Sequence, residues 1–265
     1  MLKSDQLDVD VIKANLHAPT VGKQILIFKC TGSTNDVAWE YATSQNNSGL
    51  CVFAEEQTAG RGRAGAKWLS AQGQSILCSI LLVDCHCGAE LLTLASAVAA
   101  AEAINRYAQL ETRVKWPNDI IIKGKKVAGI LLESKTTDNR VDYVIGVGIN
   151  CHQKEEFFQK HEFQMPPTSI DVESNATVDR NLLATELLAS FDQWLTVAQE
   201  SSQKIIDTWG RLSSQLGHWV TVGYNQKRFS GNCIGVDPAK GLILQLDDGG
   251  VRMFDAAHTT IVKHL

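Results

Sequence analysis

Nine residues, Gly60-Arg61-Gly62-Arg63-Ala64-Gly65-Ala66-Lys67-Trp68, decide how the rest of this chain is interpreted. Their glycines match the G-x-G-x-x-G spacing of dinucleotide-binding folds, but that motif requires a helix directly after it. Residues 66–75 contain Gly73 and no helical apolar stripe, and an apolar run typical of a strand follows. The spacing also approaches a P-loop, yet the Lys-Ser/Thr pair of that motif is missing. Both nucleotide-loop interpretations are therefore rejected.

The segment instead has the composition of an anion-binding loop of its own kind. Glycines let the backbone approach a phosphate, and Arg61 and Arg63 supply planar charged donors. A flexible surface turn with solvated arginines explains the loop equally well when it is considered alone. Its three glycines and two like charges predict a loop that is mobile without ligand and closes over a bound anion.

Two further strings support an anion site. Lys115-Trp116-Pro117-Asn118-Asp119 places a cation, an aromatic ring, a rigid turn and two polar side chains together, and Lys125-Lys126 stands directly before an apolar strand. Lysines at a strand edge can point into a cleft toward phosphate or carboxylate, although a charged hairpin turn is the commoner explanation of one such pair. Gly146 and Gly148 interrupt an apolar strand, which indicates a close approach by another group.

The order of apolar runs predicts an α+β fold: a mixed sheet with flanking helices. We expect strands at 24–28, 51–54, 76–82, near 114, 120–122, 127–132 and 143–149, with helices from Ser33, over 91–107, 182–197 and 205–212. Gly124 and Asp138-Asn139 mark turns between the strands from 114 to 149, which we expect to form antiparallel hairpins. Residues 152–177 are polar, carry Pro166-Pro167 and are expected to form a loop. After Gly217, strands at 218–222, 228–236, 242–246 and 251–254 alternate with Gly/Asp/Asn turns, which is typical of a small barrel. We divide the chain into domains 1–214 and 215–265.

Composition excludes several classes of protein. The net charge of −4 argues against a protein that coats nucleic acid. The seven cysteines are an odd number and mostly lie in apolar runs, as expected of free thiols in a reducing compartment. Cys85-His86-Cys87 lacks a second Cys/His pair at zinc spacing and is interpreted as a loop. The N-terminus has no signal-peptide pattern and no run is long enough to span a membrane, so we expect a cytoplasmic protein.

In their order along the chain, these strings resemble the biotin protein ligases, also called biotin–acetyl-CoA-carboxylase ligases. The resemblance covers about residues 25–151 and has a weaker echo at Pro167-Thr168-Ser169-Ile170. It rests on Ser33-Thr34-Asn35, Gln57, Gly60 to Arg63 with Gly65, Trp68, Lys115 to Asp119, Lys126 to Leu131, and Gly146-x-Gly148-Ile149-Asn150. One position departs: the family usually has a basic residue where Ala66 stands, and Lys67 follows it.

The resemblance implies a class II synthetase-like catalytic domain, an SH3-like C-terminal barrel and no N-terminal DNA-binding domain. It implies roles for residues as well. Biotin would be held by Ser33, Thr34, Asn35, Gln57, Gly60, Arg61, Gly62, Arg63 and Lys126, and ATP or the adenylate by Trp68, Lys115, Asn118 and Asn150. Arg63, Lys126 and Asp119 are the expected catalytic residues.

The implied chemistry suits these residue types. Biotin's carboxylate attacks the α-phosphorus of ATP, and fixed cations are needed because two anions meet. A lysine of a biotin carboxyl carrier protein then takes the biotin from biotinyl-5′-AMP. Mg²⁺ is expected mainly through ATP, with no protein metal site. A lipoate–protein ligase-like acyltransferase is the alternative function, and no partner DNA or membrane is expected. The sequence leaves the oligomeric state open, a homodimer included.

Overall fold

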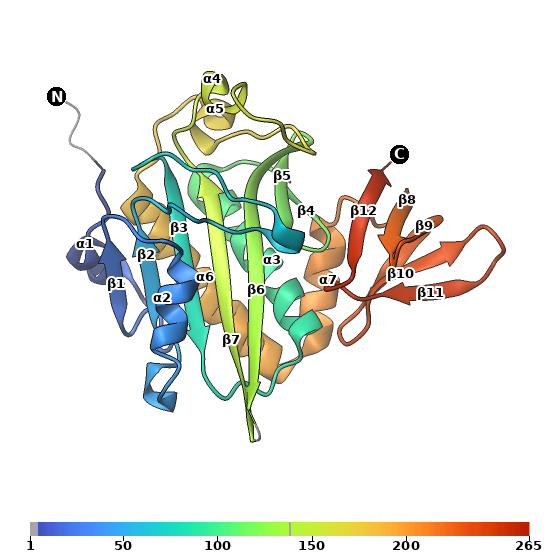
Figure 1. The fold of residues 1–265 in the computed structure, drawn as a ribbon, viewed down its shortest axis with the longest axis horizontal. Coiled ribbons are helices and arrows are strands. Elements are labelled where there is room, and N and C mark those ends of the chain that lie inside the picture. The colour runs from blue at the N-terminus through green and yellow to red at the C-terminus, as the bar shows by residue number, and fades with distance from the viewer. Residues whose placement is uncertain (1–4, 138, 265) are drawn as a thin grey trace.

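The computed structural model describes residues 5–137 and 139–264, and its centre is a seven-stranded mixed sheet (Figure 1). The strand order is β1-β2-β3-β7-β6-β5-β4, and only β1 and β2 pair in parallel among these neighbours. The strands are β1 (Ile25–Phe28), β2 (Cys51–Ala54), β3 (Ser75–Leu82), β4 (Thr112–Lys115), β5 (Asp119–Ile122), β6 (Lys125–Thr137) and β7 (Arg140–Asn150). The expected hairpins from β4 to β7 are thus confirmed. The expected turn at Asp138-Asn139 lies partly outside the described residues.

The central strands β2 and β3 are buried on both faces, because successive side chains point to opposite faces and every position of these strands is buried. On one face, α3 (Ala89–Ala108) and α6 (Arg180–Glu200) pack against each other and over the sheet, with α7 (Ser202–Leu212) beside them (Figure 1). Alanines dominate the buried side of α3, which lets the helices approach closely. On the other face, α2 (Thr34–Glu40) covers Val52, Leu81 and Val144 with Ala38.

The second sheet is antiparallel and follows α7. Its order is β11-β10-β9-β8-β12, formed by β8 (Trp219–Tyr224), β9 (Lys227–Asp237), β10 (Gly241–Leu246), β11 (Val251–Phe254) and β12 (Thr259–His264). In the part of the chain that the structure describes, β11 and β12 share no ladder, so the sheet is open. The fold class is confirmed. The domain boundary between residues 214 and 215 stays a prediction.

Several elements differ from the sequence-based expectation, including the 3₁₀ helices η1 (Gln45–Asn47) and η2 (Arg63–Gly65). Residues 152–177 hold two short helices, α4 (Glu155–Phe158) and α5 (Ile170–Ser174), rather than a simple loop. The helix α1 (Val9–Asn15) and the strand β12 were not predicted. The helix α1 buries only Ile12 and depends on its cap, the Asp8 carboxylate, which accepts from the amides of Asp10 and Val11. So short an element gives no apolar period that the sequence could reveal.

The described residues contain no helix long and apolar enough to cross a membrane. All seven cysteines are free, and Cys51, Cys78, Cys151 and Cys233 are buried. Within residues 5–137 and 139–264, no group of three or more His, Cys, Asp or Glu side chains is arranged to hold a metal ion, so Cys85-His86-Cys87 stands without further ligands there.

Candidate active site

A cavity of about 450 Å³ lies over the middle of the large sheet. The start of α2, the glycine-arginine loop and the turn between β4 and β5 form its walls, and glycines of β6 and β7 lie in its floor. Twelve of the fourteen residues predicted from the sequence line it: Ser33, Thr34, Asn35, Gln57, Arg61, Gly62, Arg63, Trp68, Lys115, Asn118, Asp119 and Lys126. Segments far apart in the sequence therefore meet in one site.

One end of the cavity is a corner of uncharged polar groups, made by Ser33, Thr34, Asn35, Gln57 and Ser79. Gln57 Oε1 accepts from the Thr34 amide at 2.7 Å and lies 3.0 Å from Thr34 Oγ1. Ser79 Oγ, buried on β3, lies 2.6 Å from Asn35 Oδ1 and 2.7 Å from Thr34 Oγ1. Because an amide oxygen only accepts, Ser79 donates to Asn35.

These bonds fix which way the two amides face. Both amide oxygens are engaged by protein donors, so the NH₂ groups of Asn35 and Gln57 remain for a ligand. Asn35 Nδ2 is buried and has no hydrogen-bond partner among the described residues. Gly146 makes room for this side chain, because a Cβ there would lie 2.5 Å from Asn35 Oδ1.

The Trp68 ring occupies the floor of the cavity. A Cβ on Gly148 would lie 2.4 Å from the indole, and one on Gly129 would lie 3.0 Å from it. The predicted close approach to the glycine-bearing strand is thus confirmed, with Trp68 and Asn35 as the approaching groups. Gly60 does not line the cavity. It holds Trp68 through the backbone instead, because its carbonyl accepts from the Trp68 amide at 3.0 Å.

Arg61 lies at the exposed edge of the cavity, where its side chain is 39% exposed. Its guanidinium makes two hydrogen bonds to the Asp36 carboxylate, at 2.7 and 2.8 Å, and a third to Glu133 at 3.2 Å. The hydrogen bond from Arg61 lowers the pKa of Asp36. Arg61 therefore already has carboxylate partners without an anion, and the mobility of the ligand-free loop stays a prediction.

Arg63 points to the C-terminal sheet. Its Nη2 donates to the carbonyls of Ala256 and Thr259, the latter at 3.0 Å, and its Nη1 donates to Asn118 Oδ1 at 3.3 Å. Burial lowers the pKa of Arg63. Glu90 Oε1 accepts from the Ala256 amide at 2.7 Å and holds the same segment. Arg63 thus joins the loop to the small sheet through neutral carbonyls, which an anion can replace.

Two lysines complete the charged end of the cavity. Lys126 Nζ lies 2.5 Å from Asp119 Oδ1 and 5.7 Å from the centroid of the Trp68 ring. Burial lowers the pKa of Lys115. Both lysines stand on strands of the sheet, so their backbones are fixed and only the side chains need to move toward a ligand.

Asn150, the other predicted residue outside the lining, supports the wall. Its Nδ2 donates to the Thr168 carbonyl at 3.0 Å, and Thr168 in turn donates its amide to the Lys126 carbonyl at 2.8 Å. The sequence analysis missed several lining or supporting residues: Ser79, Glu133, Gln164, Thr260 and Ile261. Ser79 lies in an apolar strand, and the others are distant in sequence, so spacing gave no signal for them.

A polar corner leading into paired cations, on a mixed sheet, defines the class of protein as an anion-binding α+β enzyme domain. Residues 27–150 match the model of the biotin/lipoate A/B protein ligase family. The chain is 30% identical to the bifunctional ligase/repressor BirA of Bacillus spizizenii, over 96% of this chain and 79% of that protein. It is 29% identical to the biotin–[acetyl-CoA-carboxylase] ligase of Mycobacterium tuberculosis, over 99% and 96%. The chain belongs to the biotin/lipoate A/B protein ligase family.

A solved structure has the same fold. The biotin protein ligase from Aquifex aeolicus, in complex with biotin and ATP, has a TM-score of 0.76 and 22% identity and covers 91% of this chain and 99% of its own. At that identity the likeness concerns the arrangement of the elements alone.

Proposed function

We propose that this protein forms biotinyl-5′-AMP from biotin and ATP and transfers the biotin to a lysine of a biotin carboxyl carrier protein. The main support for this function is the cavity, in which a corner of fixed amide donors continues into a wall of cations. Biotin has the same division, with a ureido ring at one end and a carboxylate at the other. The names of the relatives and their coverage of this chain support the same activity.

In the first step, biotin's carboxylate attacks the α-phosphorus of ATP, and pyrophosphate leaves. We assign Arg63 and Lys126 to the negative charge that accumulates, because preorganised cations at developing charge give the largest stabilisation. Both cations reach the cavity, and both now bond to protein groups that an oxyanion can displace. The substrate anion therefore exchanges places with Asp119 at Lys126 and with two carbonyls at Arg63.

In the second step, a neutral carrier lysine attacks the mixed anhydride and AMP leaves. We propose that Asp119 orients or deprotonates that amine, because it is the one carboxylate among the described residues that line the cavity. Once Lys126 turns to the adenylate, the Asp119 carboxylate is released from its 2.5 Å pair and can accept from the amine. Trp68, Lys115 and Asn118 are assigned to the adenylate, and Asn150 acts behind them.

Mg²⁺ fits this cavity as a companion of ATP. Magnesium is usually held by one or two carboxylates together with substrate phosphates, and Asp119 is the carboxylate in the lining. When bound, the ion would neutralise charge on the triphosphate. Arg63 and Lys126 would then serve the atoms where the new bond forms.

Lipoate is the alternative substrate of this family, and the polar corner argues against it. The dithiolane ring of lipoate cannot accept hydrogen bonds from Asn35 and Gln57, whereas a ureido carbonyl can. A site built to hydrogen-bond its ligand rejects an analogue that lacks the polar group, since buried donors are then left unpaired.

Mass spectrometry of a carrier domain tests the proposal. Incubation with biotin, ATP and magnesium should add one biotin to the carrier, and lipoate in place of biotin should add nothing. A carrier of unchanged mass, with no biotinyl-5′-AMP formed, would refute the function. That the protein works in the cytoplasm and does not bind DNA stays a prediction, and its oligomeric state stays open. A gel shift with operator DNA tests DNA binding, and light scattering measures the oligomeric state.

A further inference from the structure

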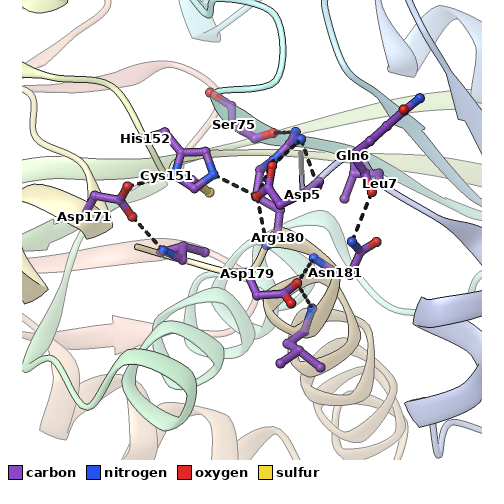
Figure 2. A network of polar contacts seen from close by, with 12 residues as sticks. Asp5, Gln6, Leu7, Ser75, Cys151, His152, Asp171, Asp179, Arg180 and Asn181 are labelled. Atoms are coloured by element: carbon purple, nitrogen blue, oxygen red, sulfur yellow. Dashed lines mark hydrogen bonds and ion pairs between the residues drawn. The ribbon is translucent and has the colours of Figure 1, made fainter. Parts of the chain in front are cut away.

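A partly buried ionic cluster follows the end of β7, and none of its residues lines the cavity (Figure 2). At its centre is His152, two residues after Asn150, with a side chain that is 13% exposed. Its Nε2 lies 2.8 Å from Asp5 Oδ2, and its Nδ1 lies 2.8 Å from Asp171 Oδ2. The reaction proposed above uses none of these three groups, so the cluster needs another explanation.

The geometry fixes the charge of His152. An ionised carboxylate only accepts hydrogen bonds, so two carboxylates at the two ring nitrogens require that both nitrogens carry protons. Burial alone would lower the pKa of His152, but the bonds to Asp5 and Asp171 outweigh burial and raise it. The two carboxylates therefore favour the imidazolium form of the ring.

The other side of the cluster ties down the chain's first described residues. Arg180, whose side chain is 2% exposed, donates to both oxygens of Asp5 and, at 2.7 Å, to Glu55 Oε2. Glu55 Oε1 accepts from the Leu7 amide at 2.7 Å, and Asn181 bonds to the backbone of Gln6 and Asp8. Burial opposes ionisation of Asp5, but the bonds from His152 and Arg180 win and lower its pKa to about 2. Cys151 and Tyr107 also interact electrostatically with Asp171.

From Asp171 the contacts lead to the active site. Asp171 belongs to α5, and the Asp171 amide donates to the Cys151 carbonyl at 3.0 Å. The N-cap of α5 is Ser169, which directly follows Thr168 in the chain. On the other side of that cap, the Lys126 amide donates to the Pro166 carbonyl and the Lys126 carbonyl accepts from the Thr168 amide, both at 2.8 Å. The start of α5 and the backbone of Lys126 are thus parts of one hydrogen-bonded unit.

We propose that His152 is a positioning residue for Lys126: clamped as an imidazolium between Asp5 and Asp171, it holds α5 and the 166–168 segment against β6. The inference rests on the proposed function, since it concerns the lysine assigned to the reaction. It also gives the clamp a pH range. Because the folded pKa of His152 is raised, its contribution is full below the ordinary pKa of about 6.5 and is lost as pH rises through the folded value. Because the folded pKa of Asp5 is lowered, its contribution is full above about 3.8 and is lost as pH falls toward 2.

The test uses the intact protein in two measurements. The first is amide exchange at Lys126 and Thr168 in the ligand-free wild type, from about pH 6 to about pH 10, corrected for the intrinsic rate. Exchange at both amides should rise several-fold as His152 loses its proton. NMR of the imidazole ring follows the His152 titration in the same samples. Exchange that does not follow the His152 titration would overturn the proposal without any variant.

The second measurement compares His152→Gln and His152→Arg in biotinyl-5′-AMP formation. The glutamine variant should lose about tenfold in kcat with little change in KM for biotin, because a misplaced lysine impairs the reaction while the polar corner stays intact. The arginine variant keeps a charge that does not titrate here, so it should recover part of the rate and show no alkaline decline assigned to His152. His17→Gln, an exposed histidine, is the matched control.

The outcomes separate the two proposals. Equal kcat in wild type and His152→Gln, with the carrier still biotinylated, would overturn the positioning role and leave the proposed function standing. Amide exchange that follows the His152 titration in a wild type that biotinylates no carrier would refute the function and leave the clamp of the Lys126 backbone standing. A glutamine variant that loses rate only in proportion to its folded fraction would also overturn the positioning role.

Discussion

The two ends of the cavity are built on opposite principles. At the polar corner, Thr34, Asn35, Gln57 and Ser79 already hold one another through hydrogen bonds, which leaves the two amide NH₂ groups for a ligand. At the charged end, Arg63 is hydrogen-bonded to carbonyls and Lys126 is paired with Asp119, and we propose that a substrate anion replaces these partners. A preorganised corner gives affinity at low entropic cost, whereas exchangeable cations give a response to the anion. The comparison predicts that substitutions at the charged end affect the reaction, and that those at the corner affect binding.

The largest effect is expected at Lys126. Lys126→Ala should slow biotinyl-5′-AMP formation by roughly a hundredfold, because a fixed charge at developing negative charge is lost. The free energy of unfolding should change by less than about 1 kcal/mol, since the pair with Asp119 is partly solvated. Single-turnover kinetics and thermal unfolding measure the two effects. Lys125→Ala, which removes a more exposed lysine paired with Glu173, is the control. Parallel losses of rate and thermal stability would assign Lys126 a structural role instead.

Arg63 should come next. Arg63→Ala should weaken retention of the adenylate by about 1.5–3 kcal/mol, the usual cost of losing a hydrogen bond to a charged group. The rate at which labelled biotinyl-5′-AMP leaves the protein measures this loss. Arg113→Ala is the control, because this exposed arginine bonds to Glu111 and the Arg211 carbonyl. If the adenylate leaves both variants and the wild type equally fast, Arg63 does not contact it.

Ser79 tests the other end of the cavity. Ser79→Ala should raise KM for biotin about five- to tenfold, since Asn35 loses the donor that fixes its amide and one hydrogen bond is worth about 1 kcal/mol. The value of kcat should stay unchanged, because biotin's ureido ring, which the corner is proposed to bind, changes far less than its carboxylate in the transition state. Ser190→Ala removes a buried hydroxyl that donates to the Ala99 carbonyl on the helices, and controls for lost stability. A lower kcat at unchanged KM would show that Ser79 affects the reaction rather than the binding of biotin, which contradicts the comparison.

The smallest effect concerns the outer anchor of the loop. Asp36→Asn weakens the exposed pair with Arg61, so trypsin should cut after Arg61 about two- to threefold faster in the ligand-free protein. Biotin should suppress cutting in both proteins, because the closed loop covers the site. Biotinylation itself should change by less than about twofold. A loop that trypsin cannot cut even without biotin is preformed, and the idea of ligand-driven closure would then be abandoned.

Most of this site could be predicted from the sequence because its chemistry is local. The Gly60 to Trp68 loop, the Lys115 to Asp119 turn and Lys126 are short strings that together resemble those of the biotin protein ligases, and twelve of the residues named from that resemblance line one cavity. The sheet and its major helices followed from apolar periods of two and 3.6 residues, which depend only on neighbouring positions. The two glycines of β7 predicted a close approach, and Asn35 and Trp68 make it.

Tertiary structure alone decided which groups these residues meet. Arg61 and Arg63 look alike in sequence, yet one turns to Asp36 and the other to the carbonyls of Ala256 and Thr259, almost two hundred positions away. The same holds for Ser79 beside Asn35, and for Asp5 beside His152 and Arg180. Periodicity states which face of an element is buried but not which distant segment covers it. Hydrogen bonds are directional and act over about 3 Å, so their partners are set only when the whole chain has packed.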